Sequence, residues 1–185
     1  MSYIPSLTLP SAIFKAPAIS ILLPIAGGFI TGFTGQDFLR SGYQKLKKPP
    51  LNPPDWVFGP VWTVLYGLMG YAAYRAWSTG MASYDPLKVE DTRRGATLYT
   101  VQLALNLLWM PLFFTLRQPV AGVVDIFALD ASVIYLAYIW SKVDVVSSYC
   151  LLPYVGWLSF ATYLSLGLGH LNRWNFTSVD RPKVQ

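Results

Sequence analysis

Charged residues are scarce in this sequence: they make up 12% of its 185 residues, whereas 54% are hydrophobic. Soluble domains carry about 25% charged residues, and so few charges cannot cover the surface of a water-soluble globule of this size. The apolar residues also fall in long blocks, with the charges gathered between them. Blocks of about 20 apolar residues are typical of membrane-spanning helices. We therefore expect a single-domain integral membrane protein.

Cysteine and histidine are nearly absent, with one residue of each. Because Cys150 stands alone, an intrachain disulfide and a cysteine metal cluster are excluded. His170 lies at the end of an apolar block, a position more typical of the membrane interface than of a haem ligand. The sequence offers no obvious general acid–base pair, and we predict no metal site.

The apolar blocks predict an all-α fold, a five-helix transmembrane bundle that fills residues 18–171. The expected spans cover roughly residues 18–38, 56–77, 92–116, 120–140 and 149–171. A short extension, residues 1–17, precedes the first span and does not resemble a matrix presequence, because Lys15 is its one basic residue. A polar tail, residues 172–185, follows the last span. The loop of residues 39–55 is basic and proline-rich, and it is longer than most connections between helices.

The formal net charge of +5 comes from basic residues at the ends of the apolar blocks. This placement favours contact with lipid headgroups, and we expect no nucleic-acid partner. Five spans put the proline-rich loop and the C-terminus on one side of the membrane. That side holds Arg40, Lys45, Lys47, Lys48, Arg117, Arg173, Arg181 and Lys183. The excess of positive charge predicts that it is the cytosolic side.

The tryptophans fall into two classes by their depth in the predicted spans. Those at span ends fit an interfacial belt: Trp56, Trp77, Trp140 and Trp174. Trp62 and Trp109 lie roughly 9 to 10 Å below the rim that faces the proline-rich loop, and Trp157 lies near mid-span. Their indole N–H groups need partners away from water. They either fill the core or line a pocket.

Polar residues accompany the deeper tryptophans. Gln102, Asn106 and Trp109 share one helix face by their spacing. Asp125 lies roughly 9 Å below the same rim, and Asp130 lies deeper. Such groups either join helices to one another or face a cavity, and an aromatic pocket with a few polar groups would suit a flat apolar ligand with polar edges.

Glycine spacing in the first span forms a GxxxG pair, Gly28 and Gly32. Such pairs allow close approach of membrane helices. The pair is compatible with packing inside the bundle and with a dimer seam.

Residues 48–66 read KPPLNPPDWVFGPVWTVLY. This stretch resembles the signature of the translocator protein family, also called the tryptophan-rich sensory protein, TspO/MBR or peripheral-type benzodiazepine receptor family. The family pattern is K-P-x-x-x-P-P-x-x-x-F-G-P-x-W-x-x-L-Y, and every fixed position is met. Residues 102–114 and 153–161 are also similar to family blocks. The resemblance covers nearly the whole chain apart from its first residues and its tail.

The resemblance implies a five-helix bundle, commonly a homodimer, with a ligand cavity that opens toward the loop between the first two spans. Family members bind protoporphyrin IX and haem, and in many cases sterols. We therefore expect a membrane receptor for tetrapyrroles that assists their transport or sensing and requires no cofactor. The matching cavity positions are Trp62, Asn106, Trp109, Trp157, Phe160, Ala161 and Leu164, and Trp56 with the loop of residues 39–55 would form a lid.

Further ligand contacts are expected from the residues themselves. Gln102 and Asn106 would donate hydrogen bonds to polar edges of the ligand, and Asp125 lies at the same depth as the tryptophans. The propionates of a porphyrin would prefer a cationic rim. The candidate rim residues are Arg40, Lys47, Lys48 and Arg117.

Other functions stay open. Some bacterial relatives are associated with light- and oxygen-dependent porphyrin breakdown, and such an enzyme would use Trp62 and Trp157. A sterol transporter is less favoured, because the animal cholesterol motif needs a tyrosine and then a basic residue where Leu166 and His170 stand here. A membrane scaffold without a ligand is a further alternative. The family occurs in bacterial membranes and in the mitochondrial outer membrane, and the extension without a presequence favours the latter in a eukaryote.

Overall fold

The computed structural model describes residues 2–34 and 42–176. The predicted end of the first span, Arg40 and most of the tail lie outside these residues. Within them the chain is helical and contains no strand. The elements are η1 (Pro5–Leu7), α1 (Ser11–Lys15), α2 (Pro17–Thr34), η2 (Tyr43–Lys45), α4 (Asp55–Met81), α5 (Pro86–Met110), the π-helical turn η3 (Pro111–Thr115), α6 (Pro119–Val143) and α7 (Val145–Leu171).

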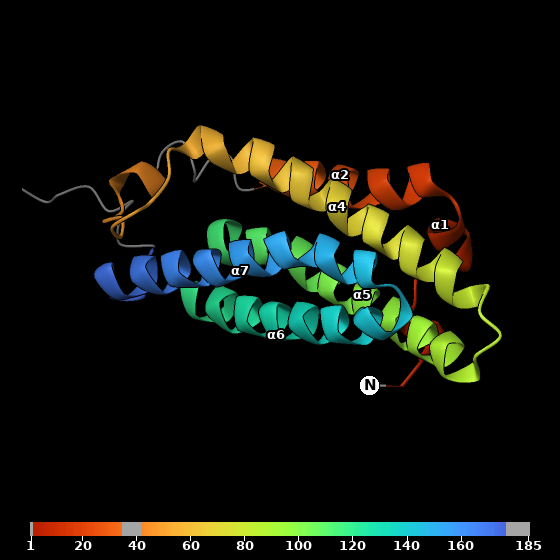
Figure 1. Cartoon of the computed structure of the whole chain (residues 1–185). Coiled ribbons are helices and arrows are strands. Elements are labelled where there is room, and N and C mark those ends of the chain that lie inside the picture. Colours follow the sequence, from red (N-terminus) through yellow and green to blue (C-terminus); the bar gives the residue numbers. More distant parts are fainter. Residues whose placement is uncertain (1, 35–41, 177–185) are drawn as a thin grey trace, which may run out of the picture.

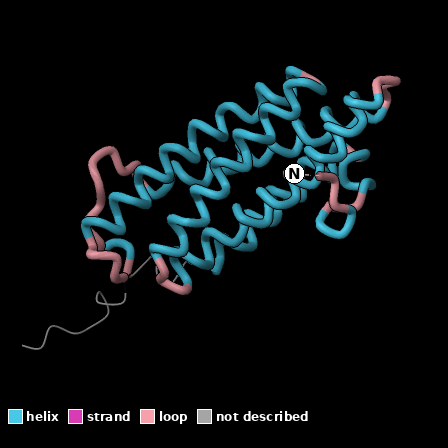
Figure 2. Tube along the Cα trace, turned by 90° about the horizontal axis from the view of Figure 1, so that it is seen from below, coloured by secondary structure: helices cyan, strands magenta, loops and turns pink. Residues whose placement is uncertain are grey.

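The long helices α2, α4, α5, α6 and α7 run along a common direction and form one bundle (Figure 1). Around the bundle, α2 packs on α4, α4 on α7, α7 on α6, and α6 on α5. Figure 2 shows the loops and turns gathered at the two ends of the long helices. The ring closes between α2 and α5, where Gly27 faces Leu107.

Local sequence determines where several helices begin. Proline stands at the first position of α2, α5 and α6, where its missing N–H is not needed and its φ suits a helix. Asp144 precedes α7, and its side chain accepts a hydrogen bond of 2.9 Å from the backbone N–H of Ser147. This N-cap satisfies one of the free donors at the start of the helix.

Glycines set the distance between α2 and α4. A Cβ atom at Gly70 would collide with the backbone of Ser20, and one at Gly28 would collide with the ring of Tyr66. Gly28, the first member of the GxxxG pair, therefore packs inside the bundle. At Gly32, the second member, a Cβ atom would meet no heavy atom within 4 Å.

Four helical stretches within the described residues are long and apolar enough to cross a membrane. They are Pro17–Thr34, Pro86–Thr115, Pro119–Val143 and Val145–Leu171. Their outer faces carry large apolar side chains such as Ile30 and Val124, which are 66% and 65% exposed. Such faces are expected to lie against lipid. The prediction of an all-helical membrane protein is confirmed.

Two helices extend beyond the predicted spans at the end of the bundle remote from the proline-rich loop. α4 continues to Met81 and α5 begins at Pro86, whereas the predicted spans end at 77 and begin at 92. Hydropathy marks only the apolar part of a helix. Outside the hydrocarbon a helix continues until a cap or a turn ends it, as the N-cap Asp85 does here.

The N-terminal extension is packed on this same end of the bundle. Phe14 is buried and stacks on Trp77 with ring centroids 5.2 Å apart, and it contacts Tyr99 edge-on. Trp77 and Trp140 are only 8% and 1% exposed. The prediction that these two tryptophans form an interfacial belt was therefore wrong, because neighbouring elements cover them.

Candidate functional site

A cavity of about 630 Å³ lies among the five long helices, beneath the loop that joins α2 to α4. This volume is within the range of about 300 to 1,000 Å³ that is typical of small-molecule sites. The lining is mostly aromatic and aliphatic, with a few polar side chains such as Asn106 and Ser165. The cavity could therefore hold a largely apolar molecule with a small number of polar groups.

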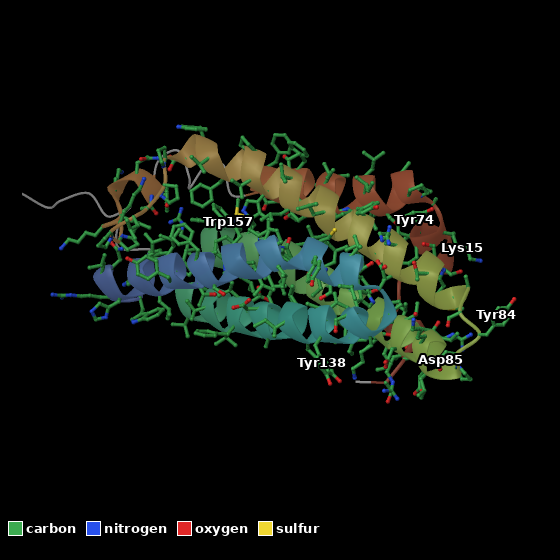
Figure 3. All side chains as sticks on the ribbon, in the orientation of Figure 1. Lys15, Tyr74, Tyr84, Asp85, Tyr138 and Trp157 are labelled. Atoms are coloured by element: carbon green, nitrogen blue, oxygen red, sulfur yellow. The ribbon has the colours of Figure 1, made fainter. Side chains whose placement is uncertain are left out.

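The structure brings most of the predicted ligand-binding residues to this cavity. Those that line it are Trp62, Asn106, Trp109, Trp157, Ala161 and Leu164. They come from α4, α5 and α7, and Figure 3 labels Trp157 on the side of α7 that faces α4. α6 contributes Ile126 and Leu129.

Four predicted residues do not line the cavity. Trp56 is 75% exposed at the start of α4. Gln102 is fully buried below the cavity floor, and Asp125 is buried in α6. Phe160 lies behind Trp157, with ring centroids 5.7 Å apart. Gln102 and Phe160 therefore position lining residues.

A chain of hydrogen bonds forms the floor of the cavity and joins α4, α5 and α7. The hydroxyl of Tyr66 donates to Oδ1 of Asn106 at 2.7 Å. Nδ2 of Asn106 donates to the hydroxyl of Tyr154 at 2.8 Å, which in turn donates to Oε1 of Gln102 at 3.3 Å. Gln102 then contacts the sulfur of Met69. Both amides thus have partners within the protein.

Aromatic rings form the walls. Phe58 of α4 meets Trp157 of α7 edge-on, with centroids 5.8 Å apart. Trp62 lies over Tyr66 at 5.3 Å, and Trp109 stacks on Phe113 at 5.0 Å. These contacts restrict the orientation of the indoles and give the cavity flat faces.

The indole N–H groups of Trp109 and Trp157 are buried and have no hydrogen-bond partner among the described residues. Because these nitrogens are inaccessible, the two indoles present carbon atoms to the cavity. One carboxylate oxygen of Asp125 is also buried and unpaired within the described structure. Gly122 of α6 lies against Phe113 of η3. Since η3 continues α5 and α6 runs antiparallel to it, this contact places Asp125 at about the level of Trp109.

The loop between α2 and α4 is attached to the end of α7. Asn172 accepts a hydrogen bond from the backbone N–H of Lys47 at 3.0 Å and donates one to the carbonyl oxygen of the same residue at 2.9 Å. The hydroxyl of Tyr163 donates to the carbonyl of Pro50 at 3.0 Å. From the loop, Tyr43 and Asn52 reach the cavity. The described part of the proline-rich loop therefore covers the cavity end.

Burial raises the pKa of the Tyr43 hydroxyl, so this group stays neutral and donates to Oδ1 of Asn52 at 3.2 Å. Lys48 lies 4.4 Å from the centre of the Tyr43 ring and 3.7 Å from a carboxylate oxygen of Asp55. Asp55 also lines the cavity. The rim is thus a cation–aromatic–carboxylate cluster rather than a purely cationic one.

The other predicted rim residues are placed differently. The Lys47 side chain is exposed. Arg117 is half-buried in the turn before α6, with a positive φ of 54°, and it does not line the cavity. Arg40 lies outside the described residues.

Sequence reasoning missed several lining residues. Tyr66 closes the KPPLNPPDWVFGPVWTVLY motif and follows Trp62 by four positions, so its helix face could have been inferred. Ile126 and Leu129 are ordinary apolar residues and carried no signal. Gly32 of α2 was interpreted only as a packing residue, although it lines the cavity. Within the described residues, no three His, Cys, Asp or Glu side chains are grouped as a metal site would need.

The sequence was compared with known proteins. The profile of the TspO/MBR family matches residues 20–171. The chain is 43% identical over 154 residues to the tryptophan-rich protein TspO of Archaeoglobus fulgidus, covering 83% of this chain and 94% of the relative. It is 40% identical over 152 residues to the translocator protein homolog of Schizosaccharomyces pombe, covering 82% and 88%. With the human translocator protein, identity is 36% over 151 residues, covering 80% and 86%. The chain therefore belongs to the TspO/MBR family.

Proposed function

We propose that this protein is a membrane receptor for tetrapyrroles such as protoporphyrin IX or haem, and that it assists their transport or sensing. The observation that carries the proposal is the aromatic cavity of about 630 Å³ within the bundle. A flat macrocycle would stack on the faces of Trp62, Trp109 and Trp157. Its apolar edges would bury against Ala161 and Leu164. The stacking of flat rings on aromatic faces is favourable beyond the area that it buries.

The polar edge of such a ligand would lie toward the loop. Lys48 is held by Asp55 and Tyr43, so a propionate at the rim would compete with Asp55 for the ammonium group. The exposed side chain of Lys47 can reorient toward a propionate more easily than that of Lys48. We propose that these two lysines, rather than the buried amides, meet the propionates.

We also propose that the chain crosses the membrane five times. α4 is 27 residues long, which corresponds to roughly 40 Å of helix and exceeds the hydrocarbon thickness of about 30 Å. It packs on both α2 and α7, which are themselves apolar enough to span. With five spans, the excess of positive charge on the side of the proline-rich loop favours a cytosolic C-terminus. The proposed location in a eukaryote is the mitochondrial outer membrane. A homodimer stays a prediction.

The function is tested by titrating the purified protein in nanodiscs with protoporphyrin IX and following tryptophan fluorescence. Replacing Trp62 and Trp157 together with phenylalanine removes two indole faces from the cavity, and we expect at least about tenfold weaker binding. Trp56→Phe is the matched control, because Trp56 is 75% exposed outside the cavity. Equal affinity in the double variant and the control would contradict the site.

Porphyrin breakdown is the second candidate, because Trp62 and Trp157 line the same cavity. Illuminating the protein–porphyrin complex in air distinguishes the two functions. Loss of the porphyrin absorption band in the parent, but not in the double variant, would indicate an enzyme. A parallel sterol titration tests the third alternative; binding of sterol without porphyrin would overturn the proposed ligand class.

A further inference from the structure

The exposed residues of the cavity lining all belong to two helices. Phe29 and Phe33 of α2 line the cavity and are 58% and 67% exposed. Asp55, Gly59 and Thr63 of α4 line it and are also exposed. The lining residues of α5, α6 and α7 are buried or half-buried. A residue that both lines a cavity and faces the outside marks its mouth, so the mouth lies along the α2–α4 seam.

Packing along this seam is close at one end and open at the other. Toward the end remote from the loop, Gly70 abuts the backbone of Ser20, and Gly28 abuts the Tyr66 ring. Toward the loop, a Cβ atom at Gly32 would meet no heavy atom within 4 Å. The described part of the seam is therefore closely packed at Gly28 and Gly70 and has open space at Gly32.

α4 also has open space beside it, one turn nearer the loop than Thr63. Gly59 also has no heavy atom within 4 Å of the position of a Cβ atom. Gly28 faces Tyr66 across the antiparallel seam, so Gly32, one turn further along α2, lies at about the level of Thr63. Two glycines and a small hydroxyl residue thus border the mouth of the cavity.

The surroundings of the mouth are apolar. On α2 Ile30 is 66% exposed, and on α4 Val64 is 61% exposed. Thr63 lies roughly 12 Å along the helix from Asp55. The mouth therefore extends from the headgroup region, at the Asp55–Lys48 pair, into the hydrocarbon. The end of the cavity, in contrast, is covered by the described part of the loop, where Tyr43 is 5% exposed.

We infer that the α2–α4 seam is a lateral portal through which a flat amphipathic ligand dissolved in the bilayer enters the cavity. The inference rests on the proposed function, since it requires the cavity to hold a ligand. The apolar body of the ligand passes between Gly32 and Thr63, and its polar edge stays at headgroup depth beside Asp55. The portal therefore selects ligands that partition into one leaflet with a polar group at its surface.

Cross-linking the seam tests the portal directly. Gly32→Cys and Thr63→Cys are introduced into a Cys150→Ser background and joined by a reducible bis-methanethiosulfonate cross-linker in nanodiscs. Stopped-flow quenching by protoporphyrin IX then measures ligand entry. We expect entry into the cross-linked, empty protein to slow by about tenfold or more. Protein cross-linked after loading should retain its ligand for correspondingly longer, and reduction should restore both rates.

A bulky substitution provides an independent test with a matched control. Gly59→Phe narrows the portal, whereas Gly156→Phe adds the same side chain on the exposed face of α7. Gly156 also has open space at its Cβ position and does not line the cavity. The contact of Phe58 with Trp157 places the two glycines at similar depth.

The expected result is slower association and dissociation in Gly59→Phe, with parent rates in Gly156→Phe. Parent rates in both the cross-linked protein and Gly59→Phe would overturn the portal while leaving the binding site intact. Equal slowing in Gly156→Phe would also overturn it. Absence of protoporphyrin binding in the parent protein would instead overturn the proposed function.

Discussion

Replacing Asn106 with leucine tests the hydrogen-bond chain in the cavity floor. Leucine has a similar size but neither donates nor accepts a hydrogen bond. Asn106 is 6% exposed, and its side chain bonds to both Tyr66 and Tyr154. In the variant, Tyr154 keeps its acceptor on Gln102. The hydroxyl of Tyr66 loses the one acceptor that it has among the described residues.

The expected loss of stability follows from this difference. A buried polar group left without a partner costs about 1–3 kcal/mol, and side-chain hydrogen bonds between membrane helices contribute about 0.6 kcal/mol on average. We therefore expect Asn106→Leu to lower the free energy of unfolding by about 1–2 kcal/mol. Tyr66→Phe should cost about 1 kcal/mol. The double variant should cost less than the sum of the two, because no hydroxyl is then left unpaired.

Reversible unfolding of the protein in mixed micelles by sodium dodecyl sulfate measures these free energies. Tyr135→Phe on the outer face of α6 is the control, since Tyr135 is 43% exposed, and it should behave like the parent. Additive losses in the Tyr66→Phe/Asn106→Leu cycle would refute the coupling between the two side chains.

Two further predictions concern the ends of the seam and of the bundle. Gly70→Val should destabilise the fold by about 1–3 kcal/mol, because the new side chain collides with the Ser20 backbone. Gly67→Val is the control and should leave the stability unchanged, since a Cβ atom at Gly67 meets nothing within 4 Å. Equal melting temperatures of the two variants would contradict the α2–α4 packing. Asp144 accepts hydrogen bonds from Arg75 at 2.8 and 3.0 Å, which lower the pKa of its carboxyl to about 2. Because this pKa is below its ordinary value, the stabilisation is present above about pH 4 and is lost as the pH falls toward 2. Solvent screens the partly exposed Arg75, so Asp144→Asn should lower the free energy of unfolding by about 1 kcal/mol at pH 7. The variant should then lose less of its remaining stability than the parent as the pH falls. An unchanged dependence of stability on acid pH would contradict this assignment.

Much of the bundle could be predicted because hydrophobic length and proline placement are local properties. The apolar blocks located α6 and α7 to within a few residues. Trp77 and Trp140 show where this reasoning fails. Both lie at the ends of apolar blocks, yet Phe14 and the helices around them bury their rings, and such cover depends on contacts between distant parts of the chain.

In the site, too, local spacing could be predicted, whereas contacts between helices could not. Trp62 and Trp109 could be placed at one depth from helix rise alone, and Asn106 could be placed on the same helix face as Trp109 from its spacing. Spacing did not reveal that Gln102 lies outside the cavity lining, because its partners, Tyr154 and Met69, are on other helices. The mouth between Gly32 and Thr63 was also beyond sequence reasoning, since it depends on the separation of two helices. A GxxxG pair indicates that close approach is possible, but only the structure shows which glycine is used for it.

Filling the cavity tests the central claim most directly. Ala161 lines the cavity, so Ala161→Trp would place an indole in the space proposed for the ligand, whereas Ala128→Trp adds the same group on the exposed face of α6. With protoporphyrin IX titrated into each folded variant in nanodiscs, the proposal predicts at least about tenfold weaker binding for Ala161→Trp and parent affinity for Ala128→Trp. Parent affinity in Ala161→Trp would show that the ligand binds elsewhere.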